Sequence, residues 1–521
     1  MLLLGCACLN LYRLGAGSLW DQDETKYAEI AQEIVQTGDP VTLRSNGQTW
    51  YVHPPFYMWL VAGTGRVLGF DEFSVRIWSA LFSLLALYAT VLLGGALFDP
   101  RVGLLAGAVL AVTLQYLVQS RLAVFDTVLL AWMLLALHAF YSAYRRGRRA
   151  DYLRFFLFAG LGTLTKGPIG LVLPGLLAAV FITLRRAWSR WREVPWAAGG
   201  ALYAAVGLSW YALQTALHGQ AFVSSVFGTY TVGRFFGVVE NQANPWWLYF
   251  PVVFLGAFPW TSFWPAAAGF HWARRAADGS LIVILWCVIT FLFYSLAGTK
   301  LPNYILPFYP FAAIGVAALW LDALTRRRFG RALSVSLLFL VVLVAALFAG
   351  VAGYLGGTYP AQYHAGAHVL ALPGAALLAG VGIVLFFAAR GQVMPAFVTL
   401  CLTIAVLWLG LVQGLLPLVE AQKPMKPLAL AIRSQLAPGD RIIGYRMNVH
   451  ASLPFYTAHE VEWVDTPEAL RAGVCAPGRA FLIGFNGDLR PLRRGLPPGV
   501  HAMLSRDDAT VFIKPASARC D

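Results

Sequence analysis

An acidic stretch near the N-terminus, Trp20–Ile30, holds the first side chains of this sequence that could do chemistry. Asp21, Asp23, Glu24 and Glu29 place four carboxylates within nine residues of an otherwise strongly apolar chain. Such carboxylates could belong to a reacting site, but aspartate is also a preferred residue at the N-cap of a helix. The local sequence leaves both roles open for Asp23.

A histidine, His53, is the second candidate, and two prolines follow it within the aromatic stretch Trp50–Leu60. Proline suits the first turn of a helix, and an aromatic helix is typical of a membrane interface. His53 would then lie at the positive end of that helix. There it could contribute to an anion site, or it could simply bond to the backbone.

Further polar side chains interrupt apolar sequence at several later points. Ionisable groups at membrane depth are costly, and they indicate a functional site when several converge. For any single residue, a snorkelling or ion-paired side chain is the alternative. The residues concerned are Arg121, Asp126, Lys166, Tyr230, Arg234, Glu240, Asn241, Gln242, Lys300 and Tyr304.

The composition of the chain indicates the solvent around it. Of its 521 residues, 59% are hydrophobic and 12% are charged, and the mean hydropathy is +0.64. Soluble globular domains have about 25% charged residues, so an ordinary water-soluble globule is excluded. The sequence predicts an α-helical, polytopic membrane protein.

The acidic stretch leads into a predicted amphipathic helix. Apolar residues recur at helical spacing from Tyr27 to Val35, and Glu29 and Glu33 fall on the opposite face. This pattern predicts a helix that lies on the membrane surface and ends at Gly38.

Hydropathy predicts thirteen spans. The first apolar run, Leu2–Gly17, has no basic region before it, and we interpret it as a helix rather than a cleaved signal peptide. The stretch Asp151–Leu184 is broken at Thr165–Pro168 and is predicted to make two short crossings. The other predicted spans are Val75–Leu97, Val102–Val118, Ala123–Tyr144, Trp196–Leu213, Trp246–Phe263, Leu281–Ala297, Tyr304–Leu324, Leu333–Tyr354, Val369–Ala389 and Met394–Pro417.

Arginine-rich connections alternate with arginine-poor ones, which is the positive-inside pattern. The rich connections are predicted to be cytoplasmic and contain Arg145–Arg149, Arg185–Arg192, Arg274–Arg275 and Arg326–Arg331. The C-terminus and the polar residues named above then lie on the outer face. The net charge of +14 largely reflects these arginines, so it does not indicate a nucleic-acid partner.

A composition change near Met425 predicts a small α/β domain over residues 425–521, on the outer side. Residues 1–424 would form the transmembrane domain, with interfacial helices in its first outer loop, residues 18–74. The C-terminal part has no glycine-rich nucleotide fingerprint, so no nucleotide cofactor is expected. The predicted elements are helices at Pro427–Leu436, Ala451–Tyr456 and Pro467–Ala472, and strands at Arg441–Tyr445, Val461–Val464, Ala480–Gly484, His501–Leu504 and Ala509–Lys514.

The six cysteines show no metal-ligand spacing. Only Cys475 and Cys520 fall outside the predicted spans, and the topology puts both in an oxidising compartment, where paired thiols tend to become a disulfide. The sequence does not decide whether these two pair.

Six motifs occur in the order and spacing of a known family. They are Asp23–Ile30, His53–Pro55, Arg121–Asp126, Thr165–Pro168, Asn244–Trp247 and Lys300–Pro307. Over essentially its whole length the chain resembles the bacterial 4-amino-4-deoxy-L-arabinose (lipid A) transferases, which are related to the protein O-mannosyltransferases. The resemblance implies the GT-C membrane glycosyltransferase fold, with about thirteen transmembrane helices and a periplasmic C-terminal domain.

The resemblance also implies an activity. It is the inverting transfer of a sugar from a polyprenyl-phosphate carrier to a lipid A-like glycolipid or another envelope glycan, at the periplasmic face of the bacterial inner membrane. Cationic side chains and a helix N-terminus can hold the carrier phosphate, so no cofactor and no obligatory metal are implied.

Residue roles follow from the matching motifs. Asp23 would be the base or the electrostatic partner of the transition state, with Glu24 beside it and Asp126 as a second acid. The residues that would contact substrate are Tyr27, His53, Arg121, Lys166, Arg234, Lys300 and Tyr304.

One position departs from the family pattern. Where these transferases commonly have a lysine that contacts the carrier phosphate, this chain has His53, which is only partly charged near neutral pH. This favours a relative with another sugar or acceptor, and a protein O-glycosyltransferase is one alternative. A lipid-linked sugar flippase is an alternative from another class, but no inverted repeat is found, and broken spans occur only at Lys166–Pro168. A membrane scaffold is weaker still, because it needs no acidic helix beside a histidine-proline helix.

Overall fold

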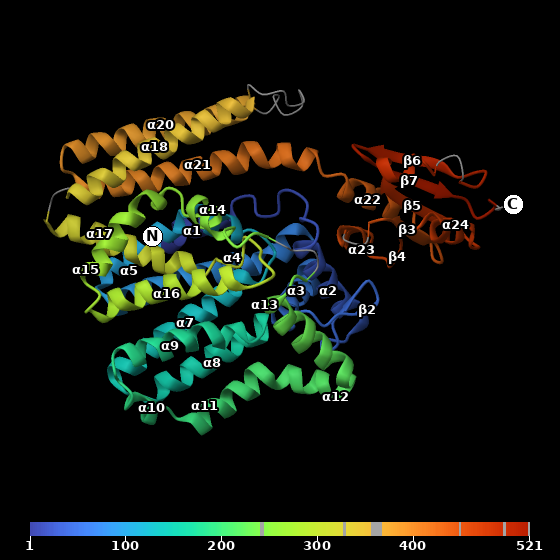
Figure 1. The fold of residues 1–521 in the computed structure, drawn as a ribbon. Coiled ribbons are helices and arrows are strands. Elements are labelled where there is room, and N and C mark those ends of the chain that lie inside the picture. Colours follow the sequence, from blue (N-terminus) through green and yellow to red (C-terminus); the bar gives the residue numbers. More distant parts are fainter. Residues whose placement is uncertain (240–243, 327–329, 356–366, 448–449, 493–495, 519–521) are drawn as a thin grey trace. The chain divides into compact units, whose positions relative to one another are not determined.

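The computed structural model describes the chain except for residues 240–243, 327–329, 356–366, 448–449, 493–495 and 519–521. Its contacts define two compact units (Figure 1). The first comprises Met1–Leu14, Tyr51–Tyr57 and Ile77–Leu415, and the second comprises Gly15–Trp50, Met58–Arg76 and Leu416–Asp521. Most of the predicted first outer loop thus groups with the C-terminal residues.

The first unit is a helical bundle. Among the described residues, seven helices are long and apolar enough to cross a membrane, and three shorter helices are also apolar. The long ones are α4 (Glu72–Leu97), α7 (Asp126–Arg146), α16 (Asp278–Leu296), α17 (Phe308–Arg326), α18 (Arg331–Leu355), α20 (Ala367–Ala389) and α21 (Val393–Ala421). The short ones are α1 (Leu2–Leu11), α5 (Pro100–Ala111) and α9 (Ile169–Leu184).

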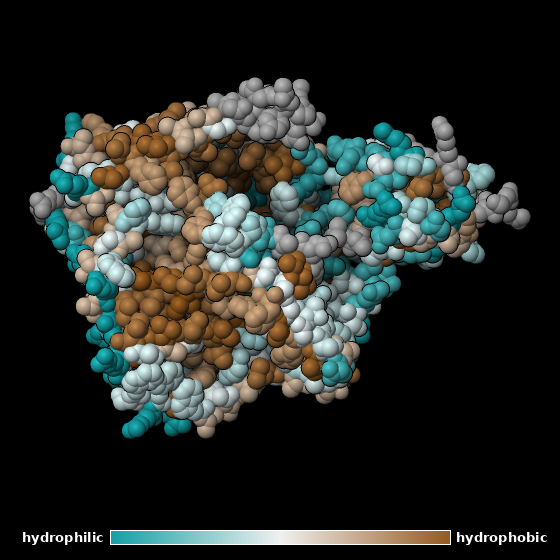
Figure 2. Space-filling view, viewed as in Figure 1, coloured by the Kyte–Doolittle hydropathy of each residue, from teal (hydrophilic) through white to brown (hydrophobic). Residues whose placement is uncertain are grey.

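The surface of this bundle is divided as a membrane requires. Hydrophobic residues gather over the sides of the helices, and hydrophilic residues gather at one end (Figure 2). The arginines of Arg145–Arg149 and Arg274–Arg275 are exposed. The remaining helical segments are α6 (Leu114–Gln119), α8 (Arg149–Lys166), α10 (Arg190–Glu193), α11 (Trp196–Tyr203), α12 (Ser209–Val223), α13 (Arg234–Phe236), α14 (Tyr249–Gly256) and α15 (Trp264–Ala273). Two π-helical stretches, Ala204–Leu208 and Ser224–Gly233, flank α12, and a 3₁₀ turn, Trp260–Phe263, precedes α15.

Two of the predicted continuous spans are wrong. The first, Val102–Val118, divides into α5 and α6 at Thr113, whose hydroxyl donates to the Val109 carbonyl at 2.8 Å. The second, Trp246–Phe263, stops after α14 at Gly256, and Pro259, which has no N–H to continue the helix, follows.

The predicted break is confirmed, because α8 ends at Lys166 and α9 begins at Ile169. That both helices cross the membrane stays a prediction. Glycines bring these helices together, because a Cβ on Gly170 would lie 2.4 Å from the carbonyl carbon of Gly162. Small residues allow such close backbone approach between membrane helices. α8 also packs along α7, the preceding helix. In this antiparallel hairpin, the last residue of α8 lies beside the first residue of α7.

The second unit contains a five-stranded mixed sheet with the order β4-β3-β5-β7-β6. β3 is parallel to β4 and to β5, and β7 is antiparallel to β5 and to β6. Every strand and helix predicted here from the sequence is confirmed. The elements are α22 (Met425–Gln435), β3 (Arg441–Tyr445), α23 (Ser452–Thr457), β4 (Val461–Val464), α24 (Pro467–Cys475), β5 (Ala480–Phe485), α25 (Asn486–Leu489), β6 (His501–Arg506) and β7 (Ala509–Lys514). The predicted Cys475–Cys520 pair includes a residue outside the described part and stays a prediction.

Four further elements of the chain are α2 (Asp23–Thr37), β1 (Arg44–Ser45), β2 (Gln48–Thr49) and α3 (Phe56–Leu68). α2 ends at Gly38 as predicted, with φ 71° and its N–H bonded to the Ile34 carbonyl at 3.0 Å. The predicted polar face is wrong at Glu29, which is 2% exposed. Its burial follows from the hairpin β1–β2, which packs against this face of α2.

The hairpin turn joins α2 to the edge of the sheet. The Asn46 N–H donates to Glu29 Oε1, and the Gly47 N–H donates to Glu33 Oε1 at 2.8 Å. The Asn46 amide also makes two hydrogen bonds with Val461 of β4, donating to its carbonyl at 2.7 Å and accepting from its N–H at 2.8 Å. The hairpin is thus fixed by the Glu29 and Glu33 side chains of α2 and by the side-chain amide of Asn46.

The Glu29 carboxyl makes the stability of this region depend on pH. Burial and the neighbouring Glu33 carboxyl raise the pKa of Glu29 from 4.5 to about 8. The folded protein therefore binds more protons than the unfolded chain between these values, and stability falls as the pH rises through that window. Glu29→Gln should flatten the fall measured by thermal unfolding in detergent between pH 5 and pH 8. An unchanged slope in the variant would contradict this assignment.

Candidate functional site

Asp126 is the centre of a polar cluster in the first unit. It is the first residue of α7, it is 5% exposed, and its Oδ1 accepts from the Lys166 ammonium at 2.5 Å. Its Oδ2 accepts from the Asn303 amide at 3.0 Å. The α7–α8 hairpin explains the pair, because Lys166 is the last residue of α8. Both carboxylate oxygens of Asp126 therefore have donors.

Aromatic rings surround the Lys166 ammonium. Its Nζ lies 4.9 Å from the ring centroid of Phe125 and 4.4 Å from that of Tyr304. Cations are attracted to the faces of such rings, more strongly where water is excluded. The Tyr304 hydroxyl accepts from Arg234 Nη1 at 3.4 Å. Three of the sequence-predicted residues therefore meet here.

Arg234 is placed by backbone pairing between α13 and the segment after α16. The Gly298 N–H donates to the Phe235 carbonyl at 2.7 Å, and the Thr299 N–H donates to the Arg234 carbonyl at 3.0 Å. The guanidinium lies 5.3 Å from the ring centroid of Tyr230. The neighbouring predicted residues Glu240, Asn241 and Gln242 lie outside the described part of the chain.

His53 adjoins the same cluster, with its ring centroid 4.7 Å from that of Phe125. Burial and the positive charges of Arg234 and Lys166 hold the pKa of His53 well below its usual range. The imidazole is therefore neutral at neutral pH. This corrects the expectation of a partly charged cation. The low pKa arises chiefly because the imidazole is buried, and also because two basic residues lie nearby. A bound anion would offset those charges and raise the pKa.

Lys300 lies on the segment that carries Asn303 and Tyr304, and it is 6% exposed. The Asn244 amide donates to its carbonyl at 2.9 Å, and the Tyr249 hydroxyl donates to the next carbonyl, of Leu301, at 3.0 Å. Within the described residues, the Lys300 ammonium has no carboxylate partner. A buried ammonium is costly without a counter-charge, which makes this position suitable for an anion.

The charges of the cluster sum to an excess of positive charge. Lys166 and Arg234 are cationic, Asp126 is anionic, and His53 is neutral before an anion binds. Such a site can bind a phosphate through charge-assisted hydrogen bonds.

Arg121 is not in this cluster. Its guanidinium donates to the carbonyls of Leu9, Asn10 and Arg13 at 3.2, 2.9 and 3.0 Å, around the end of α1. Arg121 therefore has a structural role in holding the first helix, and the substrate contact expected of it stays a prediction. The sequence could not show this role, because nothing in the motif indicates that its arginine bonds to backbone carbonyls of the first helix.

Glu24, in the second unit, belongs to a buried ion pair. Its Oε1 accepts from Arg76 Nε at 2.8 Å and its Oε2 accepts from Arg76 Nη2 at 2.9 Å. The Trp20 N–H donates to the same carboxylate at 2.9 Å. Arg76 also donates to the carbonyls of Gly17 and Ser18 at 3.0 and 3.1 Å. Glu24 thus fixes the chain ahead of α2, and the direct catalytic role expected of it stays a prediction.

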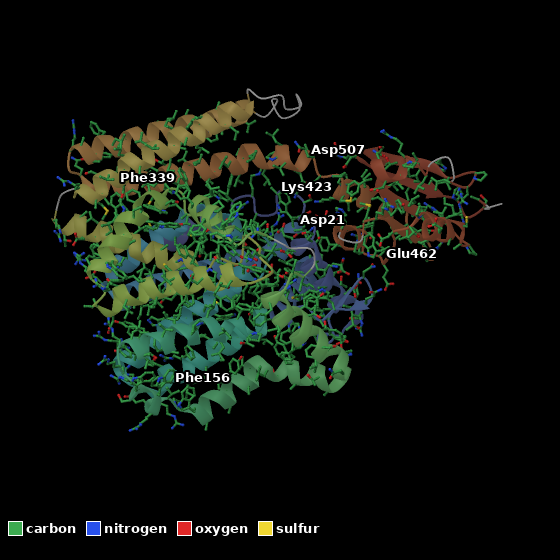
Figure 3. All side chains as sticks on the ribbon, viewed as in Figure 1. Asp21, Phe156, Phe339, Lys423, Glu462 and Asp507 are labelled. Atoms are coloured by element: carbon green, nitrogen blue, oxygen red, sulfur yellow. The ribbon has the colours of Figure 1, made fainter. Side chains whose placement is uncertain are left out.

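Asp21 and Asp23 have different surroundings in this unit. Asp21, which is labelled in Figure 3, accepts from the Ser452 N–H and lies close to His450. The distances are 3.1 Å to the Ser452 nitrogen and 3.1 Å to His450 Nδ1. Asp23 is the first residue of α2 and is partly exposed, while Gln22 occupies the N-cap position. Asp23 is therefore not the N-cap residue that the local sequence allowed.

Lys423 and Trp50 contact residues at the start of α2 and just before it. The Lys423 ammonium lies 3.6 Å from the ring centroid of Trp20 and donates to the Ser18 carbonyl at 3.0 Å. Tyr27, a predicted substrate contact, is 5% exposed, and its ring packs edge-on against Trp50.

Sequence reasoning missed two residues that the structure makes important. Asn303 binds Asp126, and the only signal was its place inside the motif Lys300–Pro307. Arg76 binds Glu24. The only feature of the sequence that could have indicated this role is that Arg76 is a basic residue near the start of a predicted span.

Comparisons with known proteins show what the chain is similar to. Residues 52–212 match the family described as dolichyl-phosphate-mannose-protein mannosyltransferase. An undecaprenyl phosphate-alpha-4-amino-4-deoxy-L-arabinose arabinosyl transferase of Pseudomonas aeruginosa is 31% identical over 314 residues, which are 59% of this chain and 56% of the relative. The protein with the same description from an Enterobacter species is 30% identical over 60% of this chain and 58% of its own length. The matched part thus spans a little over half the length of these relatives.

Solved structures extend the likeness to the whole chain. The structure of ArnT from Cupriavidus metallidurans bound to undecaprenyl phosphate covers 100% of this chain and 98% of its own, with a TM-score of 0.85 and 22% identity. An apo oligosaccharyltransferase from Archaeoglobus fulgidus covers 93% of this chain and 69% of its own, with a TM-score of 0.54 and 12% identity. The resemblance inferred from the six motifs is confirmed. The chain has the GT-C membrane fold with a C-terminal sheet domain.

Proposed function

We propose that this chain, a multi-pass membrane protein with the GT-C fold of the arabinosyl transferases, moves a sugar from a polyprenyl-phosphate carrier to an acceptor. The acceptor would be a lipid A-like glycolipid or another envelope glycan. The reaction would take place at the periplasmic face of the inner membrane, as the arginine-rich connections predict.

The observation that carries this proposal is the excess of positive charge around Asp126. A polyprenyl-phosphate sugar is a phosphodiester with one negative charge, and the carrier leaves as a phosphomonoester with a second charge developing. Cations fixed where charge develops stabilise the transition state more than the ground state. Lys166, Arg234 and Lys300 could supply that stabilisation without a metal.

The proposed bond changes are simple. An acceptor oxygen attacks the anomeric carbon from the face opposite the carrier, and the bond between that carbon and the phosphate oxygen breaks with its electron pair. Inversion follows from a single displacement. A proton on the attacking oxygen would pass to the carboxylate of Asp23, or that carboxylate would stabilise the positive charge on the sugar ring.

The other predicted residues receive supporting roles. Asp126 would position Lys166, Glu24 would fix the chain that carries Asp23, and Tyr304 would orient Arg234 and Lys166. His53, neutral in the free protein, would donate a hydrogen bond to the phosphate and gain a proton as the anion binds.

A second candidate function is protein O-glycosylation from the same class of carrier. It is favoured by the match of residues 52–212 to the mannosyltransferase family. The two functions share the donor site and differ in the acceptor.

The proposal is tested by mixing purified protein with a carrier-linked sugar and an acceptor fraction. We expect release of polyprenyl phosphate that requires the acceptor, with 4-amino-4-deoxy-L-arabinose as the first sugar to try. Lipid A and a protein fraction, supplied separately, distinguish the two acceptors. Movement of the intact carrier across vesicles without its cleavage would identify a flippase instead.

The buried Lys300 ammonium gives a sharper test of the phosphate pocket. Lys300→Gln should raise the donor KM at least about tenfold, because a hydrogen bond to a charged group contributes about 1.5–3 kcal/mol. Folding should be retained, since within the described residues no ion pair is broken. Arg101→Gln, which removes an equal charge from an exposed pair with Asp99, is the control and should leave KM unchanged. An unaltered KM in Lys300→Gln would remove Lys300 from the pocket.

A further inference from the structure

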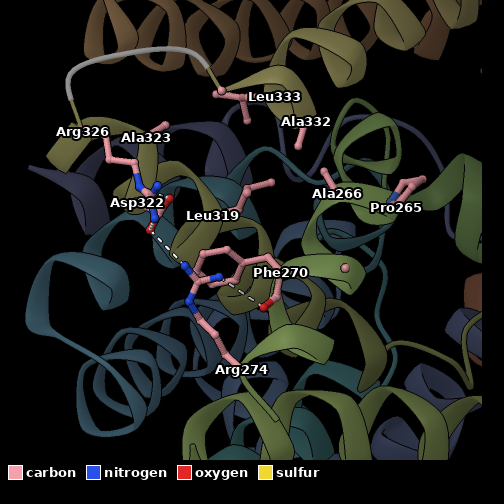
Figure 4. Close-up of a pocket in the computed structure, with 12 residues that line it drawn as sticks. Pro265, Ala266, Phe270, Arg274, Leu319, Asp322, Ala323, Arg326, Ala332 and Leu333 are labelled. Atoms are coloured by element: carbon pink, nitrogen blue, oxygen red, sulfur yellow. Dashed lines mark hydrogen bonds and ion pairs between the residues drawn. The ribbon is translucent and has the colours of Figure 1, made fainter.

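A cavity of about 490 Å³ lies between α15, α17 and the start of α18 (Figure 4). Its volume falls within the range of pockets that hold small organic ligands. It includes Arg274 and Arg326, from two of the connections that the positive-inside pattern predicts to be cytoplasmic. The proposed sugar transfer uses none of these residues.

One side of the cavity carries a charged group made by three side chains. Arg326 contacts Asp322 twice, through Nε at 2.9 Å and Nη2 at 3.1 Å, and Arg274 Nη2 lies 3.4 Å from Asp322 Oδ1. The Arg274 guanidinium also stacks 3.8 Å from the ring centroid of Phe270. Two guanidiniums share one carboxylate, so the group carries one net positive charge. Each guanidinium has five N–H donors, which is more than the contacts with Asp322 use.

The opposite side is apolar. Leu319 and Leu333 are buried and line the cavity beside Pro265 (Figure 4). Leu319 belongs to α17 and Leu333 to α18, and both helices are long enough to cross a membrane. Pro265 belongs to α15. A soluble anion would use the arginines and leave this wall unmatched. A lipid would use both, because its phosphate and its hydrocarbon are joined.

We propose that this cavity binds an anionic membrane phospholipid, with the headgroup phosphate on Arg274 and Arg326 and the upper hydrocarbon against Leu319 and Leu333. Asp322 holds the two guanidiniums in place before the lipid arrives. Planar guanidiniums can pair with phosphate oxygens through two parallel hydrogen bonds, and basic pockets between membrane helices on the cytoplasmic side suit anionic headgroups. The site is separate from the cluster around Asp126.

The test measures lipid retention on the full chain. The purified protein is placed in nanodiscs of phosphatidylcholine with increasing phosphatidylglycerol, and bound lipid is counted by native mass spectrometry. Arg274→Gln with Arg326→Gln should weaken retention of phosphatidylglycerol at least tenfold. Arg148→Gln with Arg275→Gln removes the same charge from exposed arginines outside the cavity and should retain the lipid. Arg274→Lys with Arg326→Lys keeps the charge, and it should retain part of the binding even if the glutamine pair folds poorly.

Two outcomes overturn the proposal. Equal retention by the wild-type protein and the glutamine pair would show that the cavity does not bind the headgroup. Inorganic phosphate that displaces the lipid at equal concentration would show a soluble anion as the ligand, because the apolar wall would then contribute nothing. We expect phosphate to compete at least a hundredfold less well than phosphatidylglycerol.

Discussion

Asp23→Asn is expected to lower turnover at least about a hundredfold while the protein folds normally. Asparagine has almost the same shape as aspartate, but it cannot accept a proton or carry a negative charge. At the first position of α2 the substitution also loses the attraction of a carboxylate for the helix N-terminus, which contributes about 0.3–1 kcal/mol. The measurement is the rate of polyprenyl phosphate release per folded molecule.

A matched control lies two residues earlier. Asp21→Asn makes the same chemical change in a side chain that accepts from the Ser452 N–H and contacts His450. We expect Asp21→Asn to lower stability and to leave turnover of the folded protein close to normal. If Asp23→Asn kept near-normal turnover, Asp23 would have no catalytic role, and Asp126 would become the next acid to test.

Lys166→Gln is expected to reduce both stability and activity, and a double variant can separate the two effects. Removing one partner of a buried ion pair leaves Asp126 uncompensated and costs about 3–5 kcal/mol. The double variant Asp126→Asn with Lys166→Gln removes both charges, so most of that stability should return. Thermal unfolding, followed by tryptophan fluorescence, measures this recovery.

Activity should not return with stability in the double variant. A cation needed for the developing phosphate charge is still missing, so kcat/KM should stay about a hundredfold below the wild type or lower. If activity and stability recovered together, Lys166 would serve only as the partner of Asp126. The carrier phosphate would then be left to Arg234, Lys300 and His53.

The small C-terminal domain could be predicted well because its signals are local. Short alternating strands such as Arg441–Tyr445 and Val461–Val464 are bounded by turn residues, and each was found at its observed position. The membrane helices were predicted less evenly. Hydropathy averages over many residues, so it did not detect the interruption between α5 and α6.

The site could be predicted only as a set of residue types. The motifs indicated Asp126, Lys166 and Lys300 as site residues. They did not show that Asp126 pairs with Lys166, because forty residues of a helical hairpin separate the two in the sequence. The same limit applies to Glu24, whose partner Arg76 lies 52 residues away. The protonation of His53 depends on its burial and on Arg234 and Lys166 lying nearby in space, and no property of its own sequence neighbours shows this.

The two hydrogen bonds between Asn46 and Val461 have a consequence for solubility. β4 is an edge strand, and an edge presents unpaired backbone groups that can join the sheet of another molecule and begin aggregation. The Asn46 amide imitates a peptide group there, satisfying the Val461 N–H and carbonyl as a neighbouring strand would. The hairpin therefore closes part of the β4 edge against strand addition, and loss of the Asn46 amide would open a site for intermolecular pairing.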